Sequence, residues 1–412
     1  MASRRAFLSR SLGVAVLGGT LPSFLARAAD AAALPVLGST VDPDNVLVVV
    51  QMGGGNDGLN TVVPYSDDAY HRVRPRIGVG ETEVLRLDGR IGLNPALAGL
   101  DDLYKEGHVA IVQGVGYPNP NRSHFEATQI WETASPDHPV QTGWLGRYLE
   151  TTPAPAGAQA TKLFRAVALG DIVPTALLAP GIDVPAIGSL ANFGYDSGND
   201  VASKTTAGSI YDGSQVGRSP YLQLVESTAR DAMRGGDELR KRLATYSPAA
   251  AYPTDPFSRQ LRLAAQIVDA RIGTRVIFVS IGSFDTHANQ RVRQEKLLKN
   301  LGDGLRAFQH DLAAHGHAQR VLALTFSEFG RRVNQNASDG TDHGTAMPLF
   351  VVGGGVKGGI FGEHPSLTAL DGNGDLVHAI DFRAVYATVV EKWLGRTPDG
   401  VVAGNFAPLT FV

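Results

Sequence analysis

Apolar residues along this chain come in short unbroken runs, separated by longer segments in which apolar and polar residues recur with helical spacing. Residues 46–50 are all valine or leucine, which is typical of a strand buried on both faces of a parallel sheet. Four further runs share this character: residues 109–112, 276–281, 321–326 and 349–352. We expect each run to form one strand of a central sheet.

The segments between these runs predict helices. They cover residues 95–106, 124–132, 220–244, 255–270, 290–315 and 381–394. Strands that alternate with helices predict an α/β fold with a mostly parallel central sheet flanked by helices. Residues 150–250 are richer in Ala, Gly, Pro, Ser and Asn, and we interpret them as an inserted irregular or helical cap over one end of the sheet.

The first 28 residues have the features of a twin-arginine export signal. Arg4 and Arg5 precede an apolar run over residues 12–25, and Ala26 and Ala28 supply the small residues of a cleavage site. The run is shorter than the roughly 20 residues that span a bilayer. We therefore expect a signal over residues 1–28, a linker over 29–44 and one α/β domain over 45–412. The mature chain would have no integral membrane segment, and would reach the periplasm or the exterior through the twin-arginine translocase.

Composition narrows the chemistry. The 412 residues carry a formal net charge of −3 and show no basic stripe, which argues against a nucleic-acid partner. There is no cysteine, which excludes disulfides, thiol nucleophiles, cysteine-bound zinc and iron–sulfur clusters. Any metal must therefore be held by oxygen and nitrogen atoms of Asp, Glu, His, Ser or Thr.

Acidic and imidazole side chains follow most of the expected strands, where α/β sheets bind their ligands. We predict that these residues hold a divalent metal (Zn, Mn, Mg or Ca): Asp57, Asp285, His287, Asp342 and His343, with Glu328 as a sixth candidate. An Asp in a glycine-rich turn can also cap backbone amides, and for Asp57 taken alone that interpretation is favoured.

Ser123 stands at the start of the expected helix 124–132. Its hydroxyl could cap the helix, or it could act as a nucleophile activated by a metal near the helix N-terminus. His124 beside it could act as a general acid or contact a phosphate. Arg331, or Arg122, could pair with the oxygens of a phosphate or sulfate. We take Ser123, His124 and Arg331 as the catalytic candidates.

These residues carry a family resemblance. The stretches that match are residues 51–60, 122–132, 284–290, 327–331, 340–344, 351–362 and 381–395, and through them the chain resembles the DUF1501 family of exported bacterial proteins. That family is in turn similar to the alkaline phosphatase and sulfatase superfamily. Its members hold one or two metal ions at strand ends and attack with Ser, Thr or a modified Cys.

The resemblance implies a role for each candidate. Asp57 would be the first metal ligand and Ser123 the nucleophile, and two Asp and His pairs (Asp285 with His287, Asp342 with His343) would complete the metal sites. The spacing of Asp285 and His287 departs from the superfamily pattern, in which three residues separate the pair. A last histidine is also expected downstream, where His364 and His378 are both present without a clear motif.

The sequence thus predicts an exported metal-dependent hydrolase of phosphoric esters that uses a serine nucleophile on a small-molecule or glycan ester. The C/S-x-P-x-R motif of the common sulfatases is absent, so a sulfuric-ester hydrolase without formylglycine is a weaker alternative. The incomplete ligand set leaves a further alternative, a non-catalytic envelope binding or assembly protein with the same fold.

Overall fold

The computed structural model of this chain describes residues 41–152, 164–188, 241 and 243–412. They belong to the larger of two compact units, Ser39–Val412. The expected export signal, most of the expected linker and most of the expected helix 220–244 lie outside the described residues.

Eight strands of the described chain form the central sheet, in the order β10-β5-β9-β8-β1-β7-β6 with β11 beside β5. Their bounds are β1 (Val46–Met52), β5 (Val109–Gly116), β6 (Ala166–Ala168), β7 (Val276–Ile281), β8 (Val321–Phe326), β9 (Met347–Val352), β10 (Gly359–Phe361) and β11 (Ile380–Asp381). All pairs are parallel except those of β9 with β5 and β8. The mostly parallel sheet is confirmed, and every predicted apolar run lies in a strand.

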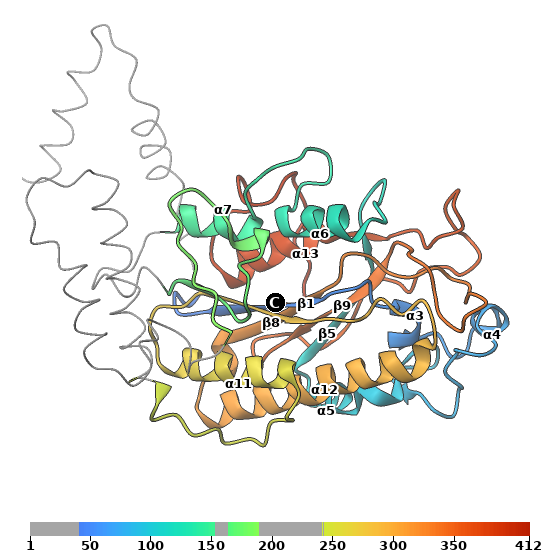
Figure 1. Cartoon of the computed structure of the whole chain (residues 1–412), viewed down its shortest axis with the longest axis horizontal. Coiled ribbons are helices and arrows are strands. Elements are labelled where there is room, and N and C mark those ends of the chain that lie inside the picture. Colours follow the sequence, from blue (N-terminus) through green and yellow to red (C-terminus); the bar gives the residue numbers. More distant parts are fainter. Residues whose placement is uncertain (1–40, 153–163, 189–240, 242) are drawn as a thin grey trace, which may run out of the picture. The chain divides into compact units, whose positions relative to one another are not determined.

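Helices cover both faces of this sheet. The alternation of side chains along β1 sends Val46, Val48 and Val50 into one buried apolar cluster and Leu47 and Val49 into another. The first cluster includes residues of α5 (Ala98–Lys105), α11 (Pro256–Asp269) and α12 (Gln290–Ala314). The second includes residues of α6 (His124–Thr133), α7 (Trp144–Thr151) and α13 (Phe382–Thr388), on the opposite side of the sheet (Figure 1). Helices on both faces of the sheet are therefore confirmed for the described part of the chain, whereas the predicted helix 220–244 stays a prediction.

Two features differ from the sequence prediction. Strand β6 lies inside the segment interpreted as a cap, yet it pairs in parallel with β7 as an edge of the central sheet. Its three residues are too few to produce a recognisable apolar run. A second sheet also forms after β1, from β2 (Val62–Val63), β3 (Leu85–Arg86) and β4 (Gly92–Leu93). Short helices α3 (Gly58–Thr61) and α4 (Asp68–Val73) accompany it, and two-residue strands leave no periodic pattern to detect.

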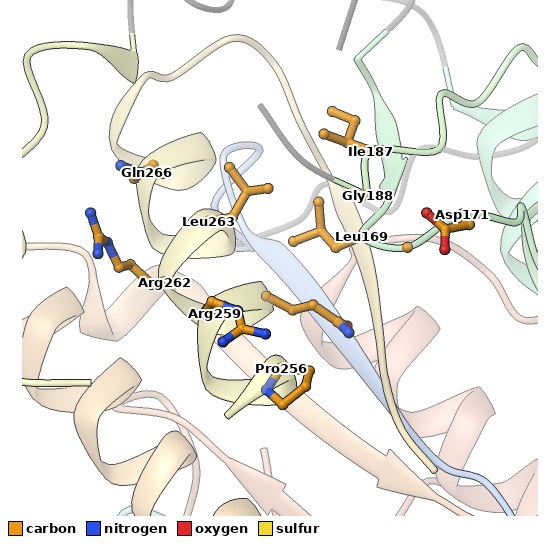
Figure 2. Close-up of a pocket in the computed structure, with 11 residues that line it drawn as sticks. Leu169, Asp171, Ile187, Gly188, Pro256, Arg259, Arg262, Leu263 and Gln266 are labelled. Carbon is orange, nitrogen blue, oxygen red and sulfur yellow. The ribbon is translucent and has the colours of Figure 1, made fainter. Parts of the chain in front are cut away.

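A pocket of about 480 Å³ lies between the end of β6 and α11 (Figure 2). Its lining includes the apolar side chains of Leu169, Ile187 and Leu263 and the charged side chains of Asp171 and Arg259. None of the residues predicted for the metal site lines this pocket. No helix among the described residues is both long enough and apolar enough to cross a membrane.

Candidate metal centre

Four predicted side chains converge beyond the carboxyl ends of the central strands. Asp285 and His287 lie in the loop after β7, His343 lies between β8 and β9, and His124 is the first residue of α6. Asp285 Oδ1 is 3.0 Å from His287 Nε2, 3.3 Å from His343 Nε2 and 3.6 Å from His124 Nε2. The Nε2 atoms of His287 and His343 are 3.0 Å apart. We call these four residues the imidazole–carboxylate cluster.

Glycines allow the loops that carry the cluster to approach closely. Gly54 has a φ of +114°, and a Cβ there would collide with the backbone nitrogen of Asp285. A Cβ at Gly340 would collide with the backbone carbonyl of His287. The glycine-rich turns after the strands therefore set how near the ligand-bearing loops can come to one another.

Each imidazole of the cluster uses its Nδ1 atom on an acceptor outside the cluster. His124 Nδ1 lies 2.8 Å from a carboxylate oxygen of Glu328, and His287 Nδ1 lies 3.0 Å from a carboxylate oxygen of Asp342. His343 Nδ1 lies 2.9 Å from the backbone carbonyl of Arg122. Ionised carboxylates and carbonyls can only accept, so each Nδ1 is the donor. In the neutral rings all three Nε2 atoms then present lone pairs toward Asp285.

This arrangement is electron-rich and fits a cation. Two imidazole lone pairs and a carboxylate oxygen lie within 3.3 Å of one another, and in the neutral tautomers no proton separates them. His124, Asp285 and His343 form the one group of three or more potential His, Cys, Asp or Glu ligands within the described chain whose ligand atoms lie within 4.8 Å of one another. Three imidazole nitrogens and one carboxylate oxygen are a suitable donor set for Zn or another first-row divalent metal.

Electrostatics keeps His343 and Asp285 in the protonation state that binds a metal. Burial lowers the pKa of His343, although the hydrogen bond to the Arg122 carbonyl opposes that shift, so the ring is neutral near pH 7. Burial alone would raise the pKa of Asp285, but the Arg331 guanidinium and the neighbouring imidazoles outweigh it and lower that pKa. Metal ligands must be deprotonated, and both groups meet this condition.

Glu328 and Asp342, predicted as direct ligands, stand behind the imidazoles. Glu328 is 3% exposed, and the oxygen that accepts from His124 also accepts from the Gly54 backbone N–H at 2.8 Å. The contact of Asp342 with His287 is the largest cause of the lowered pKa of Asp342. Carboxylates in this position fix the tautomer and orientation of metal-binding histidines. The structure therefore places both residues as supports of the cluster, outside the converging ligand atoms.

Arg331 does not have the position that substrate binding requires. Its side chain is buried, and its Nε and Nη1 donate to the carbonyls of Gly55 (2.6 Å) and Thr341 (2.8 Å). Nη2 contacts the Gly54 and Phe284 carbonyls and Asp285 Oδ1, the last at 2.6 Å. These contacts enclose the guanidinium, and Arg331 ties the loops together and orients Asp285. The structure therefore gives Arg331 no exposed donor for substrate oxygens, which differs from the sequence prediction.

Asp57 lies apart from the cluster. It caps α3 by accepting from the backbone N–H groups of Leu59 and Asn60, and its other oxygen pairs with Arg74 Nη1 at 2.5 Å in a fully buried ion pair. Gln290, the first residue of α12, also donates to it. This is the capping role that the turn sequence favours, and the structure gives Asp57 no contact with the four cluster residues. Arg74 carries no motif that singles it out in the sequence.

Ser123 is the N-cap residue of α6, immediately before His124. It is exposed and makes no side-chain capping hydrogen bond, so the simple capping interpretation does not account for its hydroxyl. Of the downstream histidines, His364 contacts the Pro365 carbonyl and His378 lines a neighbouring cavity. Neither makes a hydrogen bond or ion pair to the cluster within the described chain.

Comparison with known proteins finds a family and a set of structures. A family model described as "Protein of unknown function (DUF1501)" matches residues 110–395. The search of curated proteins found no match.

Several solved structures are similar to the chain at low identity. One is a protein in the alkaline phosphatase superfamily from Vibrio parahaemolyticus (9% identity, 81% of this chain and 66% of that chain, TM-score 0.37). Another is the PsFucS1 sulfatase from Pseudoalteromonas sp. (12% identity, 86% and 68%, TM-score 0.39). A third is the C-terminal periplasmic domain of EcEptC from Escherichia coli in complex with Zn (10% identity, 78% and 78%, TM-score 0.35).

Proposed function

Since the chain belongs to the DUF1501 family, whose description assigns no activity, we propose from the site itself that this protein is an exported, metal-dependent hydrolase of phosphoric esters. The observation that carries the proposal is the orientation of three imidazoles, each with Nδ1 on an outer acceptor and Nε2 turned toward Asp285. His124, His287, His343 and Asp285 would hold the metal. A divalent cation bound there would polarise a phosphoryl oxygen and lower the pKa of a neighbouring hydroxyl.

Ser123 is the nucleophile in this proposal. It precedes the ligand His124 directly, lies at a helix N-terminus where negative charge is stabilised, and has a hydroxyl that no helix cap uses. Ser123 Oγ would bond to phosphorus as the bond to the alcohol oxygen breaks, and water would then release the phosphate from Ser123. His124 acts through the cluster, because its Nδ1 is held by Glu328 and its Nε2 faces Asp285.

The test combines metal content with ester hydrolysis. Purified protein would be analysed for bound metal and assayed with p-nitrophenyl phosphate, bis-p-nitrophenyl phosphate and p-nitrophenyl sulfate. We expect near-stoichiometric divalent metal and hydrolysis of a phosphoric ester. His343→Ala should lose both, and Ser123→Ala should lose hydrolysis while it keeps the metal. His310→Ala is the matched control, because His310 is an exposed imidazole on α12 that pairs with Glu106.

One observation favours a second candidate, a non-catalytic envelope binding or assembly protein. Arg331, the arginine predicted to hold the substrate anion, is buried and already occupied. Protein that binds metal through His343 but hydrolyses none of the three esters would support this alternative. Hydrolysis of the sulfate ester alone would support the sulfuric-ester reaction.

Export is the remaining part of the proposal, and it rests on the sequence of residues 1–28. Replacement of Arg4 and Arg5 by lysine should retain the protein in the cytoplasm of an expressing bacterium, as cell fractionation would show. Unchanged delivery to the periplasm would contradict the twin-arginine route.

A further inference from the structure

A cavity of about 420 Å³ adjoins the imidazole–carboxylate cluster. Phe329 forms part of its wall and also packs on two cluster residues, with ring centroids 4.9 Å from His124 and 4.5 Å from His343. The loop residue Asn119, four positions before Ser123, lines the same cavity. The volume lies in the range of roughly 300–1,000 Å³ that is usual for small-molecule sites. A molecule in this cavity would therefore lie beside the cluster proposed to hold the metal.

The lining combines buried aromatic rings with hydrogen-bonding side chains. Tyr117, Trp131 and Phe329 are each at most 3% exposed, while Asn119, Asp371 and His378 supply an amide, a carboxylate and an imidazole. A purely apolar ligand would displace water from these polar groups without replacing its hydrogen bonds, which is unfavourable. The cavity is thus suited to a ligand with both apolar surface and several hydroxyl groups.

One of these polar groups, the His378 imidazole, lacks a partner within the described chain. The His378 ring makes no hydrogen bond to any described residue, and burial lowers its pKa, so it is neutral near pH 7 and offers one donor and one acceptor. An imidazole in a cavity wall without a protein partner is available to a ligand group that both donates and accepts hydrogen bonds.

Asp371 sets the charge that the cavity accepts. Burial would raise its pKa, but backbone N–H groups of Asp375 and Asn373 outweigh this and lower it, so the carboxylate is ionised at neutral pH. An ionised carboxylate accepts hydrogen bonds from hydroxyl groups and repels a second anion. It therefore selects against a leaving group that carries its own phosphate or carboxylate.

We propose that this cavity binds the alcohol part of the ester and that this alcohol is an uncharged, polyhydroxylated ring of the sugar class. The inference rests on the proposed hydrolase function and names its substrate class. Sugar hydroxyls both donate and accept, so one ring can serve the Asn119 amide, the Asp371 carboxylate and the His378 imidazole. The ring carbons would lie against the aromatic wall.

The test compares two tryptophan substitutions at exposed valines. Val377→Trp places bulk at the cavity, because Val377 lines it and is 49% exposed. Val292→Trp places the same bulk on α12, where Val292 is 77% exposed and lines no part of this cavity. Metal-loaded proteins would be assayed with glucose 1-phosphate, a phosphorylated oligosaccharide and ethyl phosphate, and titrated with methyl glucoside in a calorimeter.

We expect Val377→Trp to lower kcat/KM for a sugar phosphate by about tenfold or more, the size of one or two lost hydrogen bonds. Ethyl phosphate hydrolysis and the Val292→Trp control should be unchanged within about twofold. His378→Ala, which removes the unpartnered imidazole from the cavity wall, should produce the same selective loss. A preference for the oligosaccharide would identify a glycan end as the source of the sugar, and a preference for glucose 1-phosphate would identify a free sugar ester.

Methyl glucoside binding distinguishes an error in the cavity assignment from an error in the proposed hydrolase function. Methyl glucoside binding that Val377→Trp abolishes supports the cavity assignment even if no ester is hydrolysed, in which case only the hydrolase proposal fails. Hydrolysis with equal kcat/KM for sugar and ethyl esters in parent and Val377→Trp protein would overturn the cavity assignment and leave the hydrolase intact. Absence of both methyl glucoside binding and sugar-ester selectivity would also overturn it.

Discussion

Replacement of Glu328 by Gln gives the sharpest test of how the cluster is held. Glu328 Oε1 accepts from His124 Nδ1 and from the Gly54 N–H, each at 2.8 Å, and Oε2 accepts from the Ser327 hydroxyl at 3.2 Å. The Ser327 hydroxyl is also 2.6 Å from the Met52 carbonyl. A glutamine could therefore keep its carbonyl toward His124 and Gly54 while its amide donates to Ser327. Glu328→Gln removes the charge and retains the hydrogen bonds.

The size of the effect follows from these contacts. Loss of an outer partner of a metal-binding histidine lowers metal affinity by about 10–100-fold, or about 1.4–2.7 kcal/mol. We expect Glu328→Gln near the lower figure, because His124 keeps its orientation. Glu328→Ala should approach the upper figure, and it should also lower the free energy of unfolding of the metal-free protein by about 1–3 kcal/mol because the Gly54 N–H loses its buried acceptor.

The assay is competition for Zn between the protein and a chromophoric chelator, with urea unfolding of the metal-free protein beside it. Glu81→Gln is the control, since Glu81 is an exposed acid paired only with Arg86 across the described chain, and it should change neither quantity appreciably. If Glu328→Gln and Glu328→Ala both bind Zn as tightly as Glu81→Gln, the assignment of Glu328 as support for His124 is refuted.

Three further predictions separate structural from metal-binding roles. Asp57→Asn should lower the free energy of unfolding by about 3–5 kcal/mol, because it leaves Arg74 buried without its charged partner. Elemental analysis should find as much metal in the variant as in the parent. Loss of metal from a folded variant would show that Asp57 is a ligand after all. Burial raises the pKa of Tyr70 from 10.0 to about 12, so the protonated phenol contributes to the free energy of unfolding below pH 10. That contribution should be lost between about pH 10 and 12 in urea titrations. A Tyr70→Phe variant with the same pH dependence as the parent would refute the shift. Gly340→Ala should push the loop that carries His287 away, because the new Cβ would collide with the His287 backbone. The free energy of Zn binding should fall by more than the free energy of unfolding of the metal-free protein. Equal Zn affinity in the variant and the parent would show that the close approach is not needed.

The fold could be predicted because its strands are local and strongly patterned. Residues 46–50 contain no polar side chain. A strand with helices on both faces of its sheet buries every side chain, so an unbroken apolar run is the expected pattern. Strand β6 and the small sheet of β2, β3 and β4 could not be predicted in the same way. Their two or three residues acquire an extended form from their neighbours in space, and no periodicity marks them.

The candidate site was predictable only in part. The rule that ligands gather at strand ends found Asp285, His287 and His343, and proximity to Ser123 drew attention to His124. Contacts between residues far apart in the chain decide which carboxylates lie beside the Nε2 atoms of the three histidines. Asp57 pairs with Arg74, the residue that follows α4, and no motif marks that arginine. Arg331 is enclosed by carbonyls of three separate loops. Every residue has a backbone carbonyl, so no sequence pattern shows which carbonyls accept hydrogen bonds from a given side chain. The contacts that enclose Arg331, and the contact of the Arg122 carbonyl with His343, therefore could not be predicted from the sequence.

We propose that His124, His287, His343 and Asp285 together hold one divalent cation. Anomalous diffraction at the zinc edge, from crystals of the protein grown with Zn, would locate that cation. We expect an anomalous peak about 2.0–2.2 Å from the three Nε2 atoms and an Asp285 carboxylate oxygen. A crystal with no peak there, or with zinc bound to Asp57, would contradict it.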